Sequence, residues 1–339
     1  MSGPAAITAV LVGHEGDPSA LLAAVRSLEQ QTLAPAEIVC VDQSADQRHA
    51  RALKGRSRVR ILSPGRNLGY PSACNLAAAV AGGDHLLFLN PDARAEPGCV
   101  AELAAALMQR PEAAIAGAQV LLPDGRVNAG DNALHISGLS WAGRYGLEAE
   151  DGAPRPAAVV SGAAMLVRRR AFESLGGYTE GFFMYYDDVD LAWRARLRGW
   201  EVLFCPRARV RHDYEFAKGD YKWLWLERNR WWCLLCHLQA RTLVALAPVL
   251  AAAEVAVLLR AAREGWLEAK LESYRLLWAD RRAIASRRRD VQSSRALGDG
   301  AILARMTPRA DTPLVGSRSA ALAAGVLAAY RRLLLGALR

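Results

Sequence analysis

The sequence has little of what marks exported proteins or repeat proteins. Its first residues carry no basic segment, and the apolar run Ile7–Val12 is too short for the hydrophobic part of a signal peptide. No internal repeat and no true low-complexity tract occurs along the chain, and a composition of 52% hydrophobic and 23% charged residues makes collagen and coiled-coil classes unlikely. We therefore expect a globular chain that stays in the cytosol.

Cysteine is scarce as well. The chain has six cysteines, scattered through apolar segments at positions 40, 74, 99, 205, 233 and 236. In a reducing compartment this distribution favours buried thiols over disulfides. The Cys233–His237 segment has the spacing of a c-type haem attachment site. Because it lies in an aromatic, leucine-rich run without an export signal, we interpret that spacing as chance.

Long apolar runs are nearly absent. The one candidate for a membrane span, Leu243–Leu259, has 17 residues and includes Pro248 and Glu254. A spanning helix needs about 20 apolar residues, and a carboxylate at its centre costs roughly 2–3 kcal/mol. A simple span is therefore disfavoured, and a protein with several spans is excluded.

The chain does contain enough apolar sequence for a large core. With 339 residues, of which 52% are hydrophobic and 23% charged, it can bury enough surface to offset the entropy of ordering, which excludes intrinsic disorder. We expect one large domain or two coupled modules. The formal net charge of +9 arises entirely from residues 260–339, which contain 16 Lys and Arg against 7 Asp and Glu.

The N-terminal third alternates strand-like and helix-like segments. Apolar runs of strand length are Ile7–Val12, Glu37–Val41, Val59–Leu62 and His85–Leu89. Helix-like segments lie between them at Pro18–Gln31 and Pro71–Ala81. This alternation predicts a parallel sheet with helices on both faces, and such sheets bind ligands at the carboxyl ends of their strands. Asp42 follows the second strand and Asn90–Asp92 the fourth, where a nucleotide and a metal would sit.

The pattern becomes mixed after position 96 and helical after His237. Helix candidates are Pro97–Gln109 and Val189–Gly199, strand candidates are Val159–Val167 and Glu201–Cys205, and the Gly-rich, polar stretch Pro123–Pro156 predicts long loops. The rest of the chain combines the apolar Leu243–Leu259, the amphipathic Trp266–Ala279 and an Arg-rich remainder. A module boundary is therefore expected near position 240.

Four segments that carry chemistry occur in one order along the chain. They are Glu37–Asp46, Arg66–Asn75, Leu87–Ala93 and Gly176–Leu191. Together they resemble the inverting glycosyltransferases of family 2, over roughly Ala6 to Trp231. That resemblance implies a GT-A fold, an α/β architecture with a mixed, Rossmann-like sheet flanked by helices. The last segment is the most specific, because chance rarely reproduces an aromatic run followed directly by an acidic pair.

The resemblance implies a donor site built from the first two segments. Asp42 would recognise the donor nucleoside, since a carboxylate accepts hydrogen bonds from a base imide or from ribose hydroxyls. Asn67, Gly69 and Asn75 would lie against the nucleotide, where Gly69 permits close approach of the backbone and the following helix start offers free N–H groups. Taken alone, these residues would be an ordinary turn and a capped helix.

The third segment implies a metal site. Asn90–Asp92 stands where the family has Asp-x-Asp, and Asn-Pro-Asp is the variant of its rhamnosyltransferase-like members. Asp92 would hold a divalent metal, Mg²⁺ or Mn²⁺, which neutralises the departing diphosphate. Asn90 would keep a carbonyl ligand on the donor side, and His212 matches the family's histidine that completes the metal site.

The fourth segment implies the catalytic base. In the family an acidic pair opens a helix and its second member, here Asp188, takes the proton from the acceptor hydroxyl. Asp187 stands where the family usually has Glu, so the assignment stays open between Asp187 and Asp188, while Asp190 is expected to cap or orient. Mutual repulsion of the three carboxylates should raise the pKa of the base above the ordinary Asp value of about 3.9.

Further residues match the family's acceptor site. Gly162 and Ala163 lie in a small-residue segment that leaves room for a sugar, and Trp200 follows the acidic helix. Glu227–Trp231 is similar to the Gln-x-x-Arg-Trp box of processive polysaccharide synthases, although its first position differs. We interpret Arg228 and Arg230 as contacts to an anionic acceptor or a lipid headgroup, with plain surface arginines as the alternative.

The C-terminal region suits a membrane surface. Trp266–Ala279 places Leu267, Leu271, Tyr274 and Trp278 on one helical face, and the arginine pair 281–282 and the arginine triplet 287–289 follow. This pattern is typical of a helix that lies in the headgroup layer of an anionic leaflet. Packing on the catalytic domain or dimerisation would be the alternative, and no nucleic-acid partner is expected, because no recognised binding module accompanies the basic tail.

We therefore predict a metal-dependent inverting glycosyltransferase. It would move a sugar, with rhamnose as the first candidate, from a nucleotide-diphosphate donor to a membrane-associated, polyprenyl-diphosphate-linked saccharide in cell-wall or surface polysaccharide synthesis. It would act at the cytoplasmic face of the membrane as a peripheral or monotopic protein, with homo-oligomers as an option. The predicted modules are a nucleotide-sugar-binding half at 1–95, an acceptor half at 96–240, and a helical, basic, membrane-associating module at 241–339.

Two alternatives remain at this point. A nucleotidyltransferase on a similar sheet would need a basic, Gly-rich loop after the first strand, and Gly13–Gly16 is a poor version of one. A non-enzymatic basic protein that binds membranes or RNA would leave the four ordered segments unexplained.

Overall fold

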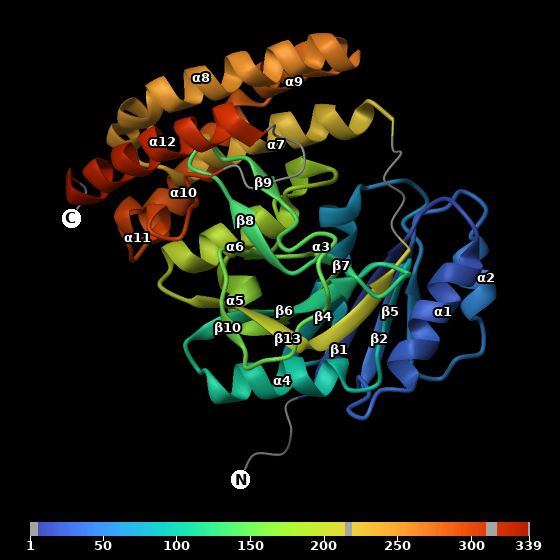
Figure 1. Cartoon of the computed structure of the whole chain (residues 1–339). Helices are drawn as coiled ribbons and strands as arrows, with labels where there is room; N and C mark the ends of the chain where they lie inside the picture. The colour runs from blue at the N-terminus through green and yellow to red at the C-terminus, as the bar shows by residue number, and fades with distance from the viewer. Residues whose placement is uncertain (1–5, 214–218, 310–316, 338–339) are drawn as a thin grey trace. The chain divides into compact units, whose positions relative to one another are not determined.

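The computed structural model describes residues 6–213, 219–309 and 317–337, and they divide into two units (Figure 1). The sheet unit comprises Met1–Asn132, Ala142–Ala195 and Trp200–Glu215. The helical unit comprises Ala133–Trp141, Arg196–Gly199 and Phe216–Arg339. The predicted three-module boundaries remain a prediction about domains, and the two units are described separately below.

The sheet unit is built on one large mixed sheet. Its strands are β1 (Ile7–Gly13), β2 (Glu37–Asp42), β3 (Val59–Leu62), β4 (His85–Leu89), β5 (Ala93–Ala95), β6 (Ala113–Leu121), β7 (Val127–Ala129), β10 (Arg155–Pro156), β12 (Ala164–Arg168) and β13 (Glu201–His212). The order along the sheet is β10-β13-β6-β12-β4-β1-β2-β3, with β5 on β13 and β7 on β6. The strands β1 to β4 are parallel, whereas β12 runs antiparallel between β4 and β6. The predicted mixed sheet is thereby confirmed.

Helices cover both faces of this sheet. They are α1 (Pro18–Glu29), α2 (Arg48–Leu53), α3 (Tyr70–Val80), α4 (Cys99–Gln109), α5 (Arg169–Ser174), the 3₁₀ turn η1 (Glu180–Phe182) and α6 (Asp187–Leu197). The apolar stripes of α1 and α4 pack on the face that carries Leu11 and Leu87. On the opposite face, Phe88 contacts Phe172 of α5 at a ring distance of 5.2 Å. Because both faces are covered, β1 and β4 read as continuous apolar runs rather than as alternating ones.

The sequence patterns located most elements and missed some details. The expected strand Val159–Val167 is two strands, β11 (Val159–Val160) and β12, because Ser161–Ala163 turns away from the sheet. The expected Glu201–Cys205 continues to His212 as β13. The stretch predicted as loops contains short strands, including β8 (Asp131–Leu134) and β9 (Ser140–Trp141). Short polar strands lack the apolar pattern on which sequence-based assignment depends.

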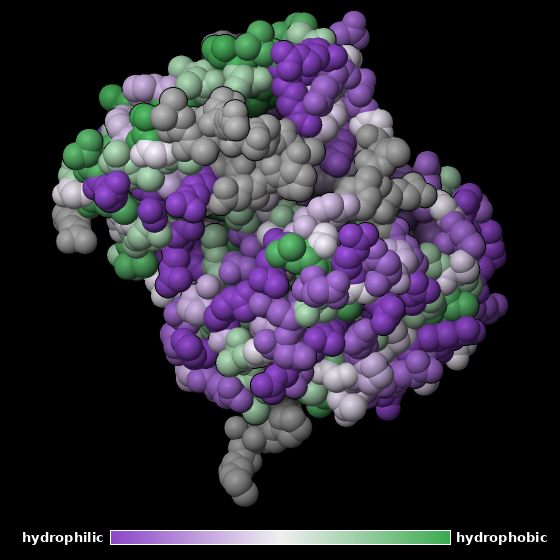
Figure 2. Space-filling model, in the orientation of Figure 1, coloured by the Kyte–Doolittle hydropathy of each residue, from purple (hydrophilic) through white to green (hydrophobic). Residues whose placement is uncertain are grey.

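The helical unit contains the rest of the chain. Its helices are α7 (Tyr221–His237), α8 (Ala240–Glu264), α9 (Leu267–Ala279), α10 (Arg281–Ser294), α11 (Asp299–Leu303) and α12 (Ser317–Ala337). The predicted helical C-terminal region is confirmed. Among the described residues, α8 alone is long and apolar enough to cross a membrane, judged by length and composition. Figure 2 shows hydrophobic side chains gathered along the top edge, over α8.

All six cysteines are unpaired and buried, so the expectation of buried thiols holds. Cys40, Cys74, Cys99 and Cys205 belong to the sheet unit, and Cys233 and Cys236 to α7 of the helical unit. Burial raises the pKa of the Cys40 thiol to about 12 and has the same effect on Cys205. Thiols in this environment are inert rather than reactive.

Candidate active site

The site is built on one edge of the sheet unit. Because β1 is parallel to both β2 and β4, the carboxyl ends of the three strands meet at the same edge. Gly13 pairs with Asp42 at the end of β1 and β2, and Asn90–Asp92 follows β4 directly. The sequence therefore predicted correctly that these polar segments share an edge.

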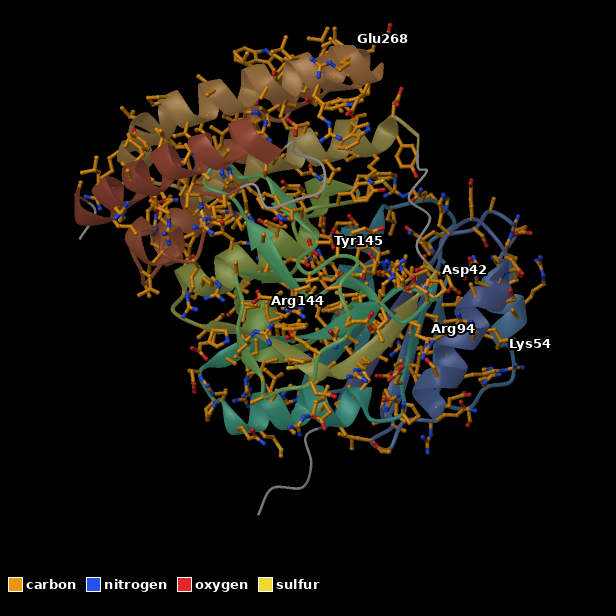
Figure 3. The ribbon with its side chains drawn as sticks, in the orientation of Figure 1. Asp42, Lys54, Arg94, Arg144, Tyr145 and Glu268 are labelled. Carbon is orange, nitrogen blue, oxygen red and sulfur yellow. The ribbon has the colours of Figure 1, made fainter. Side chains whose placement is uncertain are left out.

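Asp42 organises the loop after β2 (Figure 3). It is 2% exposed, and its carboxylate accepts hydrogen bonds from the Ser44 backbone (2.9 Å), the Ser44 hydroxyl (2.5 Å) and the Ala50 backbone (2.8 Å). Burial alone would raise the pKa of Asp42, but these donors hold it below its usual value. The side chain thus fixes the loop, and its predicted contact with a nucleoside remains a prediction.

A pocket of about 450 Å³ lies beside this loop and includes Asn67 and Arg66 in its lining. The Asn67 side-chain amide lies 3.0 Å from His14 Nε2, and His14 Nδ1 lies 3.3 Å from the Gln43 carbonyl. Gln43 accepts a hydrogen bond from Leu68 N at 2.6 Å. These contacts tie the loops after β1, β2 and β3 into one polar wall. Sequence reasoning missed His14 and Gln43, whose only signal was their place after buried strands.

Gly69 and Asn75 hold α3 against the segment that leads to the acidic pair. Gly69 has φ +78°, and a Cβ there would lie 2.5 Å from the Phe183 carbonyl oxygen. The Asn75 side chain accepts a hydrogen bond from Tyr178 N at 2.9 Å and donates one to Tyr178 O at 3.0 Å. Both groups of the amide are therefore engaged within the protein. Asn75 thus joins α3 to the backbone of Tyr178. Its predicted contact with the donor stays a prediction.

Asn90, Asp92 and His212 come together as expected. His212 Nε2 lies 2.9 Å from Asp92 Oδ1 and 3.4 Å from the Asn90 side-chain nitrogen. The pairing of β13 with β5, which sets His212 opposite Ala93, brings the histidine to this loop. The three side chains offer carboxylate, amide and imidazole donors, a set that suits Mn²⁺ or Mg²⁺. The residues present therefore fit a divalent cation.

Asp187 and Asp188 begin α6 and face Gly162. Asp188 Oδ2 accepts a hydrogen bond from Gly162 N at 2.9 Å, and Oδ1 accepts one from Val189 N at 2.8 Å. A Cβ at position 162 would lie 3.3 Å from the Asp188 Cβ and 3.6 Å from Asp187 Oδ2. Glycine at this position therefore leaves open the space beside both carboxylates.

The pair has raised pKa values. Burial, and then the charge of Asp188, raises the pKa of Asp187 to about 8. Burial also raises the pKa of Asp188, but the Gly162 and Val189 amides oppose that effect. The pair titrates as one unit, and these amides favour Asp188 as the member that carries the charge. The predicted upward shift is thus present, although burial contributes more to it than repulsion does.

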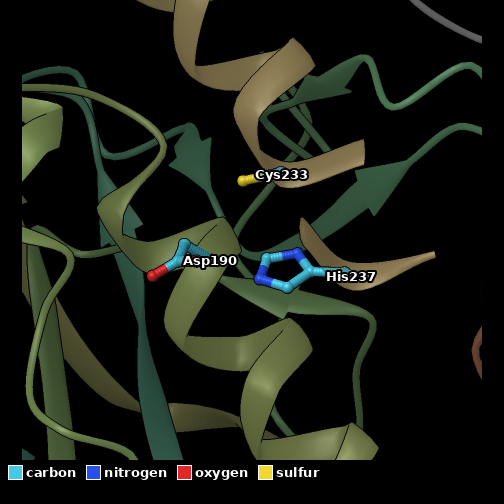
Figure 4. Close-up of side chains that lie close together, drawn as sticks. All are labelled: Asp190, Cys233 and His237. Carbon is cyan, nitrogen blue, oxygen red and sulfur yellow. The ribbon is translucent and has the colours of Figure 1, made fainter. Parts of the chain in front are cut away.

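Asp190, whose side chain is labelled in Figure 4, accepts hydrogen bonds that hold α6. Its Oδ2 accepts hydrogen bonds from Arg194 Nε at 3.0 Å and from the Thr179 hydroxyl at 2.9 Å. Asp190 and Arg194 are both buried. The third carboxylate therefore orients the helix, as expected, and is not part of the open face beside Gly162.

The aromatic run before α6 has an unusual backbone. Phe183, Tyr185 and Tyr186 have φ values of 55°, 64° and 65°. Left-handed geometry costs about 1–3 kcal/mol at such residues, and it concentrates at functional sites because the surrounding structure must enforce it. Tyr70 N donates to the Phe183 carbonyl at 2.8 Å, and the Tyr186 carbonyl accepts from Asp190 N at 2.8 Å. The run is thus fixed at both ends.

One hydrogen-bonded path joins the candidate metal loop to the candidate base. Asn90 N donates to the Ala163 carbonyl at 2.9 Å, and the adjacent Gly162 N donates to Asp188. Gly162 and Ala163, predicted from sequence as acceptor residues, form the link. The candidate metal loop and the candidate base therefore share one local framework.

The other predicted acceptor residues are not part of this hydrogen-bonded path. Trp200 follows the C-terminal end of α6, which by helix rise is about 15 Å from the end that carries the acidic pair. Arg228 and Arg230 belong to the helical unit and are buried. Arg228 pairs with Asp280, and Arg230 pairs with Glu227 and Glu254. The alternative of plain surface arginines is wrong, because both side chains are buried and paired with carboxylates. Their contact with an anionic acceptor or a lipid headgroup stays a prediction.

Comparison with known proteins identifies the family. Residues 12–176 match the family model described as Glycosyl transferase family 2. The chain is 31% identical over 219 residues to the N-acetylglucosaminyl-diphospho-decaprenol L-rhamnosyltransferase of Mycobacterium tuberculosis, covering 57% of this chain and 71% of that protein.

The chain belongs to glycosyl transferase family 2. It also resembles the O-antigen biosynthesis protein RfbC of Myxococcus xanthus, with 30% identity over 62% of this chain and 18% of that one. Among solved structures, GalNAc-T7 with UDP, GalNAc and Mn²⁺ superposes with a TM-score of 0.58 at 18% identity, over 70% of this chain and 48% of that one. The predicted family and GT-A fold are confirmed, so this family 2 protein is a glycosyltransferase with rhamnosyltransferase relatives.

Proposed function

We propose that this family 2 enzyme transfers a sugar, with inversion, from a nucleotide-diphosphate donor to a hydroxyl of a lipid-linked saccharide. The path Asn90–Ala163–Gly162–Asp188 carries the proposal. It connects the loop that would hold the metal and the donor diphosphate to Asp188, which would take the acceptor proton. The names of the relatives support rhamnose as the sugar and cell-wall or O-antigen synthesis as the pathway class.

The donor nucleotide would bind in the pocket beside β1, β2 and β3. Its wall offers polar groups from Asn67 and the loop held by Asp42, and Arg66 supplies positive charge. A second opening of about 560 Å³ shares Arg66 and Asn67 and includes Asn75 and Glu180. Arg66 therefore lies where it can contact an anionic leaving group from either side.

The Asp92 carboxylate, the Asn90 carbonyl and the His212 imidazole would hold a divalent cation. Bound there, Mg²⁺ or Mn²⁺ would supply positive charge that stabilises the departing diphosphate. The neighbour GalNAc-T7 was crystallised with Mn²⁺, which supports the class of ion.

Asp188 would act as the base. As the acceptor oxygen attacks the anomeric carbon, its proton passes to an Asp188 carboxylate oxygen, and the bond to the diphosphate oxygen breaks on the opposite face of the sugar. One displacement inverts the configuration at that carbon. The raised pKa of the pair brings its proton affinity closer to neutral pH, where a general base is most effective.

A relative that acts on a diphospho-decaprenol acceptor, by its name, supports a lipid-linked substrate for this chain. Such a substrate resides in a membrane, so we place the enzyme at the cytoplasmic face. Homo-oligomers remain an expectation, as does the absence of a nucleic-acid partner.

A donor panel tests the proposal. The purified chain is incubated with nucleotide-diphosphate sugars, a short-chain polyprenyl-diphosphate saccharide and Mg²⁺ or Mn²⁺, and the glycosylated product is measured by mass spectrometry. We expect one donor to give product with inverted anomeric configuration, excess EDTA to stop turnover, and Asp92→Ala to weaken nucleotide-diphosphate binding mainly when metal is present. Full turnover in EDTA would remove the metal from the mechanism, and a retained configuration would refute the single displacement.

A further inference from the structure

One face of α8 is exposed and wholly apolar. Val244, Val255 and Leu259 are 74%, 57% and 64% exposed, and Pro248 and alanines occupy the positions between them on this face. From Val244 to Leu259 the face runs about 22 Å without a charged residue. Only 22% of the most apolar window of α8 is buried, so α8 is not a core helix.

Ion pairs hold the opposite face of α8 to the neighbouring helices α7 and α9. Glu254 pairs with Arg230 and Lys270 at 2.5 Å each and accepts a hydrogen bond from the Tyr274 hydroxyl. Lys270 and Arg230 are fully buried and also pair with Glu227. Burial alone would raise the pKa of Glu254, but these partners hold it at about 2. Placing α8 across a bilayer would strip Glu254 of its partners and leave two buried cations to share the single carboxylate of Glu227.

A groove of about 550 Å³ continues this apolar face. Its lining includes Leu243 of α8, Leu235 of α7, and Leu277 and Trp278 of α9, with Arg281 and Arg288 of α10 among the lining residues. Trp278 is 71% exposed, and the Arg281 guanidinium lies 4.8 Å from the centre of its ring. Exposed tryptophan beside arginine is the pairing found at the boundary between headgroups and acyl chains.

Exposed arginines lie near both ends of the apolar surface and on α10. Arg241 and Arg263 are exposed near the two ends of α8, and Arg281, Arg282 and Arg289 are exposed on α10. Residues 260–339 carry the whole excess of positive charge. An apolar strip bordered by cations complements a surface with an apolar interior and anionic headgroups.

We propose that the outer face of α8 and the adjoining groove dock on an anionic phospholipid bilayer, with α8 lying in the plane of the interface. This inference rests on the proposed function, since it specifies how the enzyme would reach a lipid-linked acceptor. It assigns the contact to particular residues and makes the association monotopic rather than spanning.

Vesicle flotation of the full chain tests the docking. With phosphatidylcholine vesicles that contain phosphatidylglycerol, we expect binding that weakens in pure phosphatidylcholine, is only partly released by high salt, and is extracted by alkaline carbonate. The double variant Val244→Glu/Leu259→Glu should lower binding by about tenfold or more, because it places two charges in the interface. The matched control is Met108→Glu, whose residue is 68% exposed on α4 of the sheet unit, and it should bind like the wild type.

A labelled variant gives an independent measurement if the double variant does not fold. Because the native cysteines are buried, an environment-sensitive dye can be attached to Val255→Cys alone, with Met108→Cys as control. On anionic vesicles we expect the emission of the dye to shift to the blue when it is attached at position 255 and not when it is attached at position 108. Unchanged flotation of the double variant, indifference to lipid charge, or no shift would overturn the docking, and resistance to carbonate would show a span. Self-association in the absence of vesicles that the double variant abolishes would assign the face to a second copy.

Failure of the docking and failure of the proposed function are distinguishable. Transfer to a water-soluble acceptor analogue without vesicles should be the same in the wild type and the double variant. Loss of flotation with intact transfer supports the docking, whereas intact flotation without transfer to any acceptor refutes the enzymatic proposal alone.

Discussion

Asp187 and Asp188 are adjacent in sequence but differ in what contacts their oxygens. Two backbone amides donate to Asp188, whereas burial dominates the environment of Asp187. A base needs to be ionised before it accepts a proton, and the amides stabilise the ionised form at Asp188. The sequence left the choice between the two open, because the Gly162 amide that distinguishes them is 26 positions away.

Asp188→Asn should abolish transfer and leave donor binding nearly unchanged. The amide keeps the shape of the side chain but cannot take the acceptor proton, so we expect a loss of about 10²–10⁴-fold in kcat. Turnover and nucleotide-diphosphate affinity are measured in parallel. If Asp188→Asn retains turnover and Asp187→Asn does not, the base is Asp187.

Asp187→Asn should stabilise the protein at alkaline pH. The pKa of Asp187 is raised to about 8 in the folded chain, above the unfolded value of about 3.9. The folded state therefore favours the protonated form, and stability is lost as pH rises from about 4 through 8. Removing this carboxyl should raise the free energy of unfolding by about 1–3 kcal/mol at pH 8 and change it little at pH 4.

Thermal unfolding of both proteins across this pH range checks the prediction. Asp190→Asn is the matched control, because it breaks the buried pair with Arg194 and should destabilise at neutral pH. If Asp187→Asn gains the same stability at pH 4 and at pH 8, the pKa of Asp187 is not raised in the folded protein.

At the scale of elements, α3 positions the strained run that leads to α6. Gly69→Ala would place a Cβ 2.5 Å from the Phe183 carbonyl oxygen at a residue with φ +78°. We expect destabilisation by about 1–3 kcal/mol, together with lower kcat, since the acidic pair follows this run. Chemical denaturation and steady-state kinetics measure the two effects.

Gly98→Ala provides the control for that substitution. Gly98 also precedes a helix, but it has φ −92°, and a Cβ added there would meet no atom within 4 Å apart from those of its chain neighbours and its own helix. It should change stability by less than about 0.5 kcal/mol. Equal effects at positions 69 and 98 would show that contact with Phe183 has no special role.

Elements with strong apolar patterns could be predicted from sequence, and those set by tertiary contact could not. Strands β3 and β4 have the expected bounds because each is one apolar run between turn residues. The break between β11 and β12 arises at Gly162, where the backbone leaves the sheet to meet Asp188. Asn75 is hydrogen-bonded to Tyr178, which is 103 positions away, a contact no local pattern reveals.

On the scale of the whole molecule, the sequence located the excess charge and the helical C-terminal region but not the internal ion pairs. The sequence disfavoured a membrane span because it would place the Glu254 carboxylate in the bilayer. The structure adds that Glu254 pairs with Arg230 and Lys270. These partners come from α7 and α9, so their grouping depends on how three helices assemble. Likewise, Arg228 and Arg230 gave no sign in the sequence that they would be buried.

The buried native cysteines make the opening of each unit measurable without any engineered residue. Four thiols report on the sheet unit and two on the helical unit, and an alkylating reagent can reach each only when its surroundings open. Resolved by mass spectrometry, alkylation should proceed at one rate for Cys40, Cys74, Cys99 and Cys205 and at another for Cys233 and Cys236. Added donor nucleotide should slow the first group alone. One common rate for all six thiols would instead mean that the chain opens as a single cooperative body.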